Sequence, residues 1–159
     1  MEKINRITSF NVDHDYIVPG MYISRIDGDI VTYDLRTRTP NSGDYMDSLT
    51  MHSVEHMLAT FARNSALSDK VIYFGPMGCR TGFYLLMRGD DHKAAYELVK
   101  DILQKTVDHE GEMFGAARKE CGNYKELSLA VAKAECARYL EALIEREKLG
   151  KADLKYDEE

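Results

Sequence analysis

The sequence predicts an α+β fold in one domain over residues 1–159: a two-layer sandwich in which a mostly antiparallel sheet packs against about three to four helices. Three observations lead to this prediction. The first part of the chain shows the two-residue alternation of strands, and the later parts show the spacing of amphipathic helices. The chain has 159 residues, enough for one hydrophobic core. No repeat, linker or low-complexity segment divides it.

Strands are predicted in two parts of the chain. Residues 5–37 have the pattern of a β meander, and within it the segment 30–36 alternates strictly. This alternation puts apolar side chains on one face and Asp34 and Arg36 on the other. A loop is expected over 38–46, and two further strands are expected over 70–74 and 83–87, separated by a break at Gly75-Pro76-Met77-Gly78.

Helices are predicted in three places. The first covers about 48–64, where Asp47 or Ser48 can cap the N-terminus and apolar residues repeat at helical spacing. The other two helices cover 93–109 and about 125–148, with a loop over 110–124 between them. The tail after Gly150 is short and charged, and we expect it to be frayed.

Composition excludes several classes of protein. The net charge of −6 argues against a nucleic-acid binder, which needs a basic face. No apolar run reaches the roughly 18 residues of a membrane span, and the N-terminus does not lead into the apolar core of a signal peptide. We therefore expect a cytoplasmic protein. Its three cysteines, Cys79, Cys121 and Cys136, are then expected to be free thiols.

The strongest chemical signal is the motif His52-Ser53-Val54-Glu55-His56. On a helix, positions i and i+4 lie on one face, so both imidazoles can reach one transition-metal ion. Glu55 would lie beside that metal without having to ligate it, where a carboxylate can carry protons. The alternative is a solvated helix face that happens to hold two histidines. The amphipathic character of the helix favours the metal site.

A catalytic metal site needs a third protein ligand, with the fourth position left for water or substrate. The loop residue Cys121 is a good candidate, because a neighbouring glycine lets a loop aim its ligand and a thiolate suits zinc or iron(II). It could also be a small buried residue, as free cysteines often are. Cys136, in the middle of a helix, fits that second interpretation. The other candidates are Cys79, His14, His92, His109 and several glutamates.

Cys79 lies in a glycine-rich run between two predicted strands, Gly75-Pro76-Met77-Gly78-Cys79-Arg80-Thr81-Gly82. Such glycines let a ligand approach the backbone closely. Arg80 would favour the thiolate form of the cysteine if its side chain turned inward. The run is therefore about equally consistent with a reactive and with a structural role for the Cys79 thiol.

These features together resemble the S-ribosylhomocysteine lyase family, whose members make the precursor of autoinducer-2. The resemblance is spread over most of the chain, and the length also fits. The separated blocks make it specific where the histidine motif alone would be ambiguous. The blocks are Ser9-Phe10-Asn11-Val12-Asp13-His14, Tyr33-Asp34-Leu35-Arg36, His52-Ser53-Val54-Glu55-His56-Met57-Leu58-Ala59, Gly75-Pro76-Met77-Gly78-Cys79-Arg80-Thr81-Gly82-Phe83-Tyr84 and Glu120-Cys121-Gly122.

The resemblance implies a role for each site residue. His52, His56 and Cys121 would bind one metal ion per chain, iron(II) in the native enzymes, with zinc or cobalt as substitutes. Glu55 and Cys79 would be the acid–base pair. The family forms homodimers with the two sites near the interface. The residues implied to line or support the substrate pocket are Ser9, His14, Arg36 and Arg63. One departure affects the substrate contacts: Tyr73-Phe74-Gly75 replaces an Asp-Ile-Ser run common in the family.

The implied reaction cleaves S-ribosylhomocysteine to homocysteine and 4,5-dihydroxy-2,3-pentanedione. β-Elimination of the sulfur at C5 needs a carbonyl at C3, whereas the sugar carbonyl starts at C1. Two isomerisations must therefore move the carbonyl from C1 to C2 and then to C3. Each passes through an enediolate that a Lewis acid stabilises, and each needs a base that can later act as an acid. No organic cofactor is required.

Two other functions fit the histidine motif. One is an inverzincin-type metallopeptidase, in which Glu55 would activate water and Glu126 or Glu135 would be the third ligand. The chain is short for such a peptidase, which would also give Cys79 no role. The other is a non-catalytic metal-binding module, but structural zinc sites are usually closed by four ligands.

Overall fold

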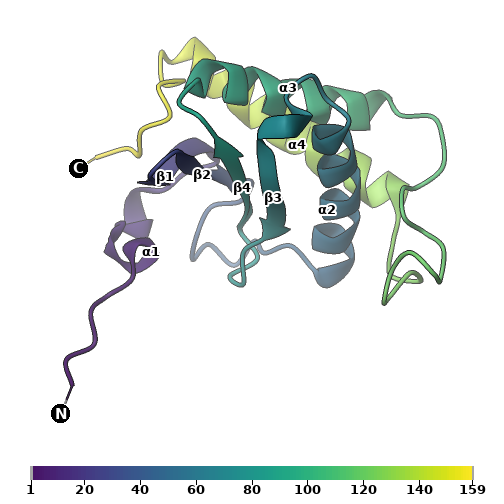
Figure 1. The fold of residues 1–159 in the computed structure, drawn as a ribbon, viewed down its shortest axis with the longest axis horizontal. Coiled ribbons are helices and arrows are strands. Elements are labelled where there is room, and N and C mark those ends of the chain that lie inside the picture. The colour runs from purple at the N-terminus through teal and green to yellow at the C-terminus, as the bar shows by residue number, and fades with distance from the viewer. Residues whose placement is uncertain (1, 159) are drawn as a thin grey trace.

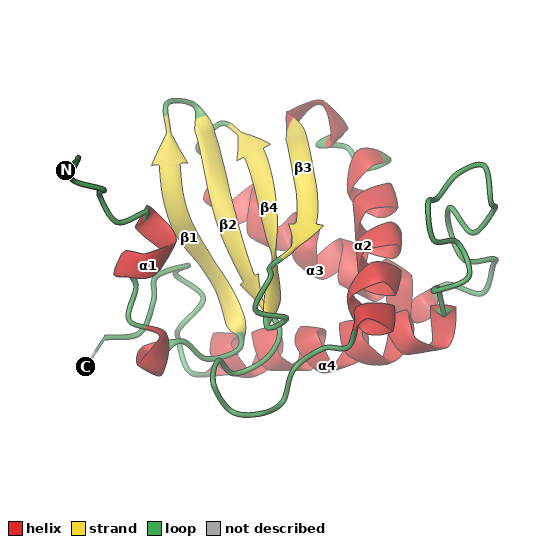
Figure 2. Cartoon of the chain, turned by 90° about the horizontal axis from the view of Figure 1, so that it is seen from below, coloured by secondary structure: helices red, strands yellow, loops and turns green. Residues whose placement is uncertain are grey.

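The fold is described by a computed structural model that covers residues 2–158. Four strands form one antiparallel sheet in the order β1-β2-β4-β3. The helices α2, α3 and α4 pack on one side of this sheet, which Figure 2 shows with α3 and α4 behind it. The strands are β1 (Gly20–Asp27), β2 (Ile30–Arg36), β3 (Val71–Pro76) and β4 (Gly82–Arg88). The helices are α1 (Thr8–Asn11), α2 (Ser48–Arg63), α3 (His92–Asp108) and α4 (Leu129–Lys148), with 3-10 turns at His14–Tyr16 and Ser68–Lys70.

The predicted α+β class and the mostly antiparallel sheet are confirmed. Alternation along β2 sends Val31, Tyr33 and Leu35 into the core between sheet and helices, where each is at most 1% exposed. Asp34 and Arg36 point to the opposite face, as predicted. No helix within the described residues is both long and apolar enough to cross a membrane.

Each long helix begins where a polar side chain caps it. The carboxylates of Asp47 and Asp91 accept hydrogen bonds from Thr50 N and Ala94 N, at the starts of α2 and α3. The Ser128 hydroxyl does the same for α4. The predicted start of the third helix near Lys125 was therefore wrong by about one turn, because the strongest cap lies three residues later.

The meander predicted over 5–37 was also too long. Only residues from Gly20 onward join the sheet, and the preceding segment forms α1 and a 3-10 turn. Asp13 caps that turn by accepting a hydrogen bond from Asp15 N, which offers the backbone an alternative to a strand ladder. At the other end of the sheet, β3 continues through Gly75 and Pro76, which were expected to break it. Proline is tolerated there because β3 is an edge strand.

The C-terminal tail was expected to be frayed, but it packs against the sheet. Leu154 is 5% exposed and packs with the core, and its carbonyl accepts a hydrogen bond from Ile23 N at 2.8 Å. The tail therefore runs along β1. The loop over 109–128 lies at the far side of the molecule, beyond α2 (Figure 1).

Candidate functional site

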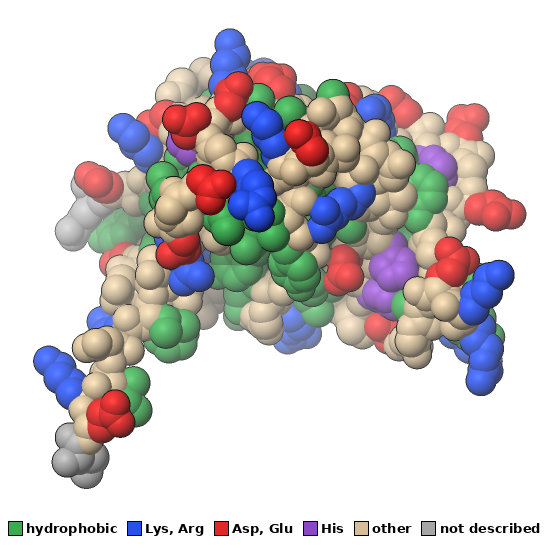
Figure 3. All heavy atoms as spheres, in the orientation of Figure 1, with side chains coloured by type: hydrophobic (Ala, Val, Ile, Leu, Met, Phe, Trp, Pro, Cys, Tyr) green, Lys and Arg blue, Asp and Glu red, His purple; other side chains and the backbone are tan. Residues whose placement is uncertain are grey.

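The two histidines of the motif lie on a flank of α2 that faces the loop over 109–128. One face of this helix is fixed in the core through residues such as Val54 and Met57. His52 and His56 are half-buried beside that face, and their ring centroids are 4.6 Å apart. Figure 3 shows a group of histidine side chains (purple) at the surface, in the region where Figure 1 has α2 and the loop. The predicted convergence of the two imidazoles is thus present.

Backbone carbonyls from the loop orient both imidazoles. His52 Nδ1 lies 2.8 Å from the Glu126 carbonyl oxygen, and His56 Nδ1 lies 2.9 Å from that of Phe114. A carbonyl oxygen only accepts hydrogen bonds, so each Nδ1 carries the proton and each Nε2 keeps a free lone pair. Such an outer hydrogen bond is typical of histidines that ligate a metal.

Cys121 completes the group. Its Sγ lies 3.3 Å from His52 Nε2, and one ligand atom from each of His52, His56 and Cys121 lies within 4.8 Å of the others. Ligands that share a tetrahedral zinc-like ion at about 2.0–2.3 Å are separated by about 3.3–3.8 Å. The three residues therefore fit a metal ion with little movement. Within residues 2–158, no other cluster of histidine, cysteine and carboxylate side chains has this geometry.

Gly115 allows the loop to approach His56 closely. Its φ of +65° lies in the left-handed region, which favours glycine. A Cβ atom at this position would lie 2.8 Å from His56 Nδ1. No local pattern in the sequence indicates this contact, because the two residues are distant along the chain.

Glu55 lies three residues after His52, on the same side of α2, and is half-buried. Neither glutamate proposed as a peptidase ligand belongs to the metal group. Glu135 is 5% exposed and its carboxylate is paired with Arg38, at 2.7 Å between Oε2 and Nη2. Glu126 contributes its backbone carbonyl to His52 instead. The ligand set thus favours the sulfur-containing site over the peptidase.

Three of the four predicted substrate residues line one narrow cavity on the outer face of the sheet. These are Ser9, His14 and Arg36. A hollow of about 310 Å³ adjoins this cavity and shares Ser9, Ser24 and Tyr84 with it. The remaining residues of the cavity wall are Val12, Ile17, Ser24, Asp34, Tyr84 and Tyr156.

Known proteins are similar to this chain over most of its length. The family model for S-ribosylhomocysteinase (LuxS) matches residues 7–149. The chain belongs to the LuxS family. The S-ribosylhomocysteine lyase of Finegoldia magna is 42% identical over 145 residues, covering 88% of this chain and 92% of that protein. The lyase of Borreliella burgdorferi (strain ZS7) is 42% identical over 146 residues, covering 88% and 93%. That of Phocaeicola vulgatus is 43% identical over 145 residues, covering 87% and 90%.

Membership of the LuxS family confirms the predicted class of enzyme, a carbon–sulfur lyase. The cysteine that was predicted to act in acid–base chemistry, Cys79, lies in the turn between β3 and β4. Cys79 is exposed there, and its Sγ lies 3.0 Å from Thr81 Oγ1. Arg36 Nη1 donates to the same hydroxyl at 2.9 Å and lies 3.9 Å from Cys79 Sγ.

The arginine beside the thiol is therefore Arg36 and not Arg80. The Arg80 side chain turns outward, with its guanidinium 5.4 Å from the centre of the Tyr45 ring. Arg80 is exposed and is not among the residues that line the cavity. Burial lowers the pKa of Arg36, but the hydrogen bonds and charge of Asp34 outweigh burial and raise it overall, with a smaller contribution from Cys79. Arg36 thus stays cationic beside the thiol.

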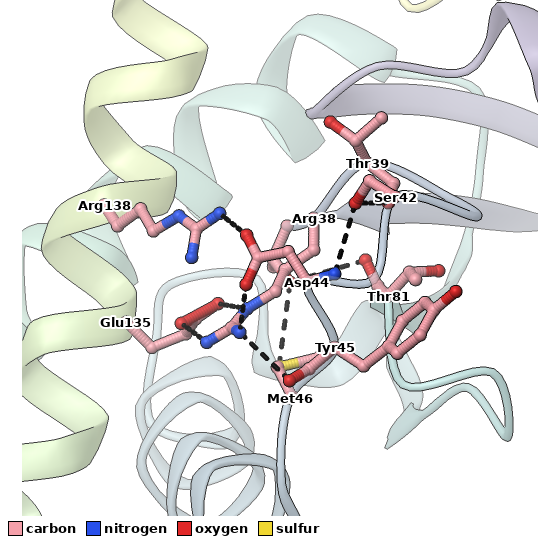
Figure 4. Close-up of polar contacts among 10 residues, drawn as sticks. Arg38, Thr39, Ser42, Asp44, Tyr45, Met46, Thr81, Glu135 and Arg138 are labelled. Atoms are coloured by element: carbon pink, nitrogen blue, oxygen red, sulfur yellow. Dashed lines mark hydrogen bonds and ion pairs between the residues drawn. The ribbon is translucent and has the colours of Figure 1, made fainter.

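A polar network fastens this turn to α4 (Figure 4). The backbone N–H groups of Thr37 and Arg38 both donate to the Thr81 carbonyl at 3.0 Å. Arg38 then forms a two-pronged ion pair with Glu135 of α4, at 3.1 and 2.7 Å. Asp44 accepts hydrogen bonds from Arg38 and from Arg138 of α4. Movement of the Cys79 turn relative to the helices is therefore restricted.

The fourth predicted substrate residue, Arg63, lies apart from the cavity. It ends α2 and donates to the carbonyls of Val71 and Ile72 at 2.6 Å, tying the helix to β3. In the nearby segment Tyr73-Phe74-Gly75, the Tyr73 ring lies across Gly75, so a Cβ atom at Gly75 would require the exposed Tyr73 side chain to move. The role of Arg63 in substrate binding stays a prediction.

Sequence reasoning missed four residues of this site: Asp34 and Thr81, which hold Arg36, Gly115 beside His56, and Tyr156 in the cavity wall. Asp34 was available from the alternation along β2, which put it beside Arg36. No local pattern marked Gly115 or Tyr156. Cys136 is 1% exposed, and burial raises the pKa of its thiol to about 12, as expected for a packing residue.

Proposed function

We propose that this protein cleaves S-ribosylhomocysteine to homocysteine and 4,5-dihydroxy-2,3-pentanedione, the precursor of autoinducer-2. The observation that carries the proposal is the group of His52, His56 and Cys121 in a chain of the LuxS family. Two carbonyl shifts along the sugar precede β-elimination of the sulfur. We place the reaction in the cytoplasm, where a reducing environment keeps Cys79 and Cys121 as free thiols.

The metal would be held by His52, His56 and Cys121, and we propose iron(II), with zinc or cobalt as substitutes. When bound, it supplies Lewis acidity that stabilises negative charge on the sugar oxygens. Three protein ligands leave a fourth position for substrate. Loss of Cys121 should abolish tight binding, so metal analysis of Cys121→Ala tests the ligand set. If Cys121→Ala kept its metal while Glu126→Ala lost it, the peptidase would be the better interpretation.

Glu55 and Cys79 would carry the protons. Each carbonyl shift removes a proton from one carbon and returns it to the next, so one group must act as base and then as acid. Glu55 reaches the substrate from the side of α2. Cys79 reaches it from the β3–β4 turn, where Arg36 Nη1 lies 3.9 Å from its Sγ. Ser9 and His14 would bind the polar parts of the substrate beside that turn.

These two sets of residues lie on different parts of one chain. Cys79, Arg36 and the cavity belong to the turn and outer face of the sheet, whereas Glu55 and the metal ligands face the loop beyond α2. Within residues 2–158, no hydrogen bond joins the two sets. We propose a homodimer in which Cys79 of one chain meets the metal ligands of its partner. A symmetric dimer then holds two such sites near its interface.

The function is tested by adding S-ribosylhomocysteine to metal-loaded protein and measuring free thiol. The parent should release homocysteine, while Cys79→Ala should keep its metal and release none. Absence of thiol release by the parent would contradict the proposed activity. Light scattering tests the dimer, which should give about 36 kDa for a chain of 18.1 kDa.

A mixed dimer tests the shared site directly. Cys79→Ala and Cys121→Ala are each inactive, but a dimer with one chain of each kind contains one complete site. Random exchange of equal amounts should therefore restore about a quarter of the parent activity. If both sets of residues acted within one chain, mixing would restore nothing.

A further inference from the structure

The C-terminal tail is held against the sheet by three kinds of contact, although it lies beyond residues 7–149 that match the family model. Its backbone pairs with β1 through Leu154 O and Ile23 N at 2.8 Å. The Leu154 side chain is buried in the core. The Asp157 carboxylate accepts from Arg146 Nη2 of α4 at 2.9 Å. These contacts on both sides of Tyr156 leave its backbone little freedom to move.

The Tyr156 side chain reaches the outer face of the sheet. Its ring stacks on Tyr22 with centroids 4.7 Å apart, and its hydroxyl donates to Asp34 Oδ2 at 2.8 Å. Burial, and then the charge and hydrogen bond of Asp34, raise the pKa of the Tyr156 hydroxyl well above its usual value. The hydroxyl thus remains protonated and can keep donating to the carboxylate.

Asp34 passes this contact on to Arg36. Oδ2 of Asp34, which accepts from Tyr156, also accepts from Arg36 Nη2 at 2.7 Å, and Oδ1 accepts from Arg36 Nε at 3.1 Å. Both members of the pair are at most 3% exposed. Because a guanidinium is planar, two bonds to one carboxylate fix its plane, and the remaining nitrogen is aimed at Thr81 and Cys79.

We propose that Tyr156 is a positioning residue for the lyase reaction: through Asp34 it fixes Arg36 beside the Cys79 thiol and closes one side of the substrate cavity. The inference rests on the proposed function, in which Cys79 transfers protons. Tyr156 touches neither the thiol nor the metal ligands within the described structure, and it acts through the orientation of Arg36. The tail is then part of the working site.

The test compares Tyr156→Phe with Tyr96→Phe in the metal-loaded protein. Tyr96 makes the same kind of bond, from its hydroxyl to Glu147 Oε1 at 2.6 Å, but on the helical side of the molecule. Two properties are measured: kcat for thiol release, and the rate at which iodoacetamide alkylates Cys79 without substrate, followed by mass spectrometry of the labelled peptide. Bound metal protects Cys121, and burial protects Cys136.

Tyr156→Phe should keep its metal and lower kcat about tenfold, the scale of one lost hydrogen bond to a charged group. It should slow alkylation of Cys79 several-fold, because Arg36 is held less firmly near the thiolate. Tyr96→Phe should leave both properties within twofold of the parent. A kcat and an alkylation rate for Tyr156→Phe that match those of Tyr96→Phe would overturn the proposal.

Two further results remain decisive. If Tyr156→Phe loses metal or fails to fold, Asp157→Asn takes its place, since it loosens the tail at Arg146 and keeps the aromatic stack. Unchanged kcat and alkylation in that variant would overturn the proposal equally. If the parent releases no thiol, the proposed function fails, whereas the alkylation rates still decide whether Tyr156 positions Arg36.

Discussion

Replacing Gly115 by alanine should weaken metal binding without removing any ligand. The new Cβ would lie 2.8 Å from His56 Nδ1 and 3.1 Å from its Cε1. Favourable non-bonded contacts begin at about 3.5 Å, so the His56 ring or the loop must move by about 0.7 Å. That movement lengthens the 2.9 Å hydrogen bond between His56 Nδ1 and the Phe114 carbonyl.

The size of the effect follows from two contributions. Loss of a hydrogen bond that orients a metal-bound histidine lowers metal affinity by about 10- to 100-fold, or about 1.4 to 2.7 kcal/mol. The φ of +65° adds about 1 kcal/mol of backbone strain for alanine, which lowers the free energy of unfolding. We therefore expect weaker zinc binding together with a small loss of stability.

Gly122 provides a matched control, because it is also in the loop, next to Cys121, and a Cβ there meets nothing within 4 Å. Zinc affinity is measured by competition with a chromophoric chelator, and stability by urea unfolding of the metal-free protein. Gly122→Ala should bind zinc as the parent does. Equal zinc affinities for Gly115→Ala and Gly122→Ala would refute the steric argument.

Three further predictions concern catalysis, stability and pH. Glu55→Gln should hold metal and fold normally while thiol release falls about 10²- to 10⁴-fold; activity within a few-fold of the parent would mean that this carboxylate carries no proton in the slow step. Glu135→Gln should lower the free energy of unfolding in urea by about 2 kcal/mol, because the largely buried Arg38 guanidinium loses its two-pronged ionic partner and keeps only the half-exposed carboxylate of Asp44. Arg138→Gln, at an exposed pair with half-exposed side chains, should cost less than about 1 kcal/mol, and similar losses in the two variants would contradict this ranking. Burial raises the pKa values of Tyr22 and Tyr33 from 10.0 to about 12. Above pH 10 the folded state therefore holds protons that the unfolded state releases. The contribution of these two residues to stability should be complete below pH 10 and lost as the pH rises to about 12. Urea unfolding at a series of pH values checks this, and a free energy of unfolding that stayed constant over that interval would contradict it.

The parts of the fold that the sequence predicted well are those with local signals. The helix that holds His52 and His56 was predicted over 48–64 and observed over Ser48–Arg63, because its cap and its apolar spacing are both local. The same holds for β2, where strict alternation placed Asp34 and Arg36 on one face.

The parts that were missed depend on contacts between distant residues. Tail docking needs Ile23, Tyr22 and Arg146 to meet residues near 156, and no periodicity reports such pairing. Likewise, Arg36 lies beside the thiol through a contact between β2 and the β3–β4 turn, which are distant along the chain. The metal ligands were predicted as a set only with the help of the resemblance, since helical spacing identifies two of the three.

The use of main-chain acceptors for both imidazoles affects which changes the loop over 109–128 can tolerate. The oxygens that orient His52 and His56 belong to the peptide groups of Glu126 and Phe114, and every amino acid would supply them equally. Side chains at those two positions can therefore be exchanged without removing an acceptor. Insertion or deletion of a single residue, in contrast, would move a carbonyl out of register with its imidazole. The metal centre should thus accept many substitutions in this loop but almost no change in its length.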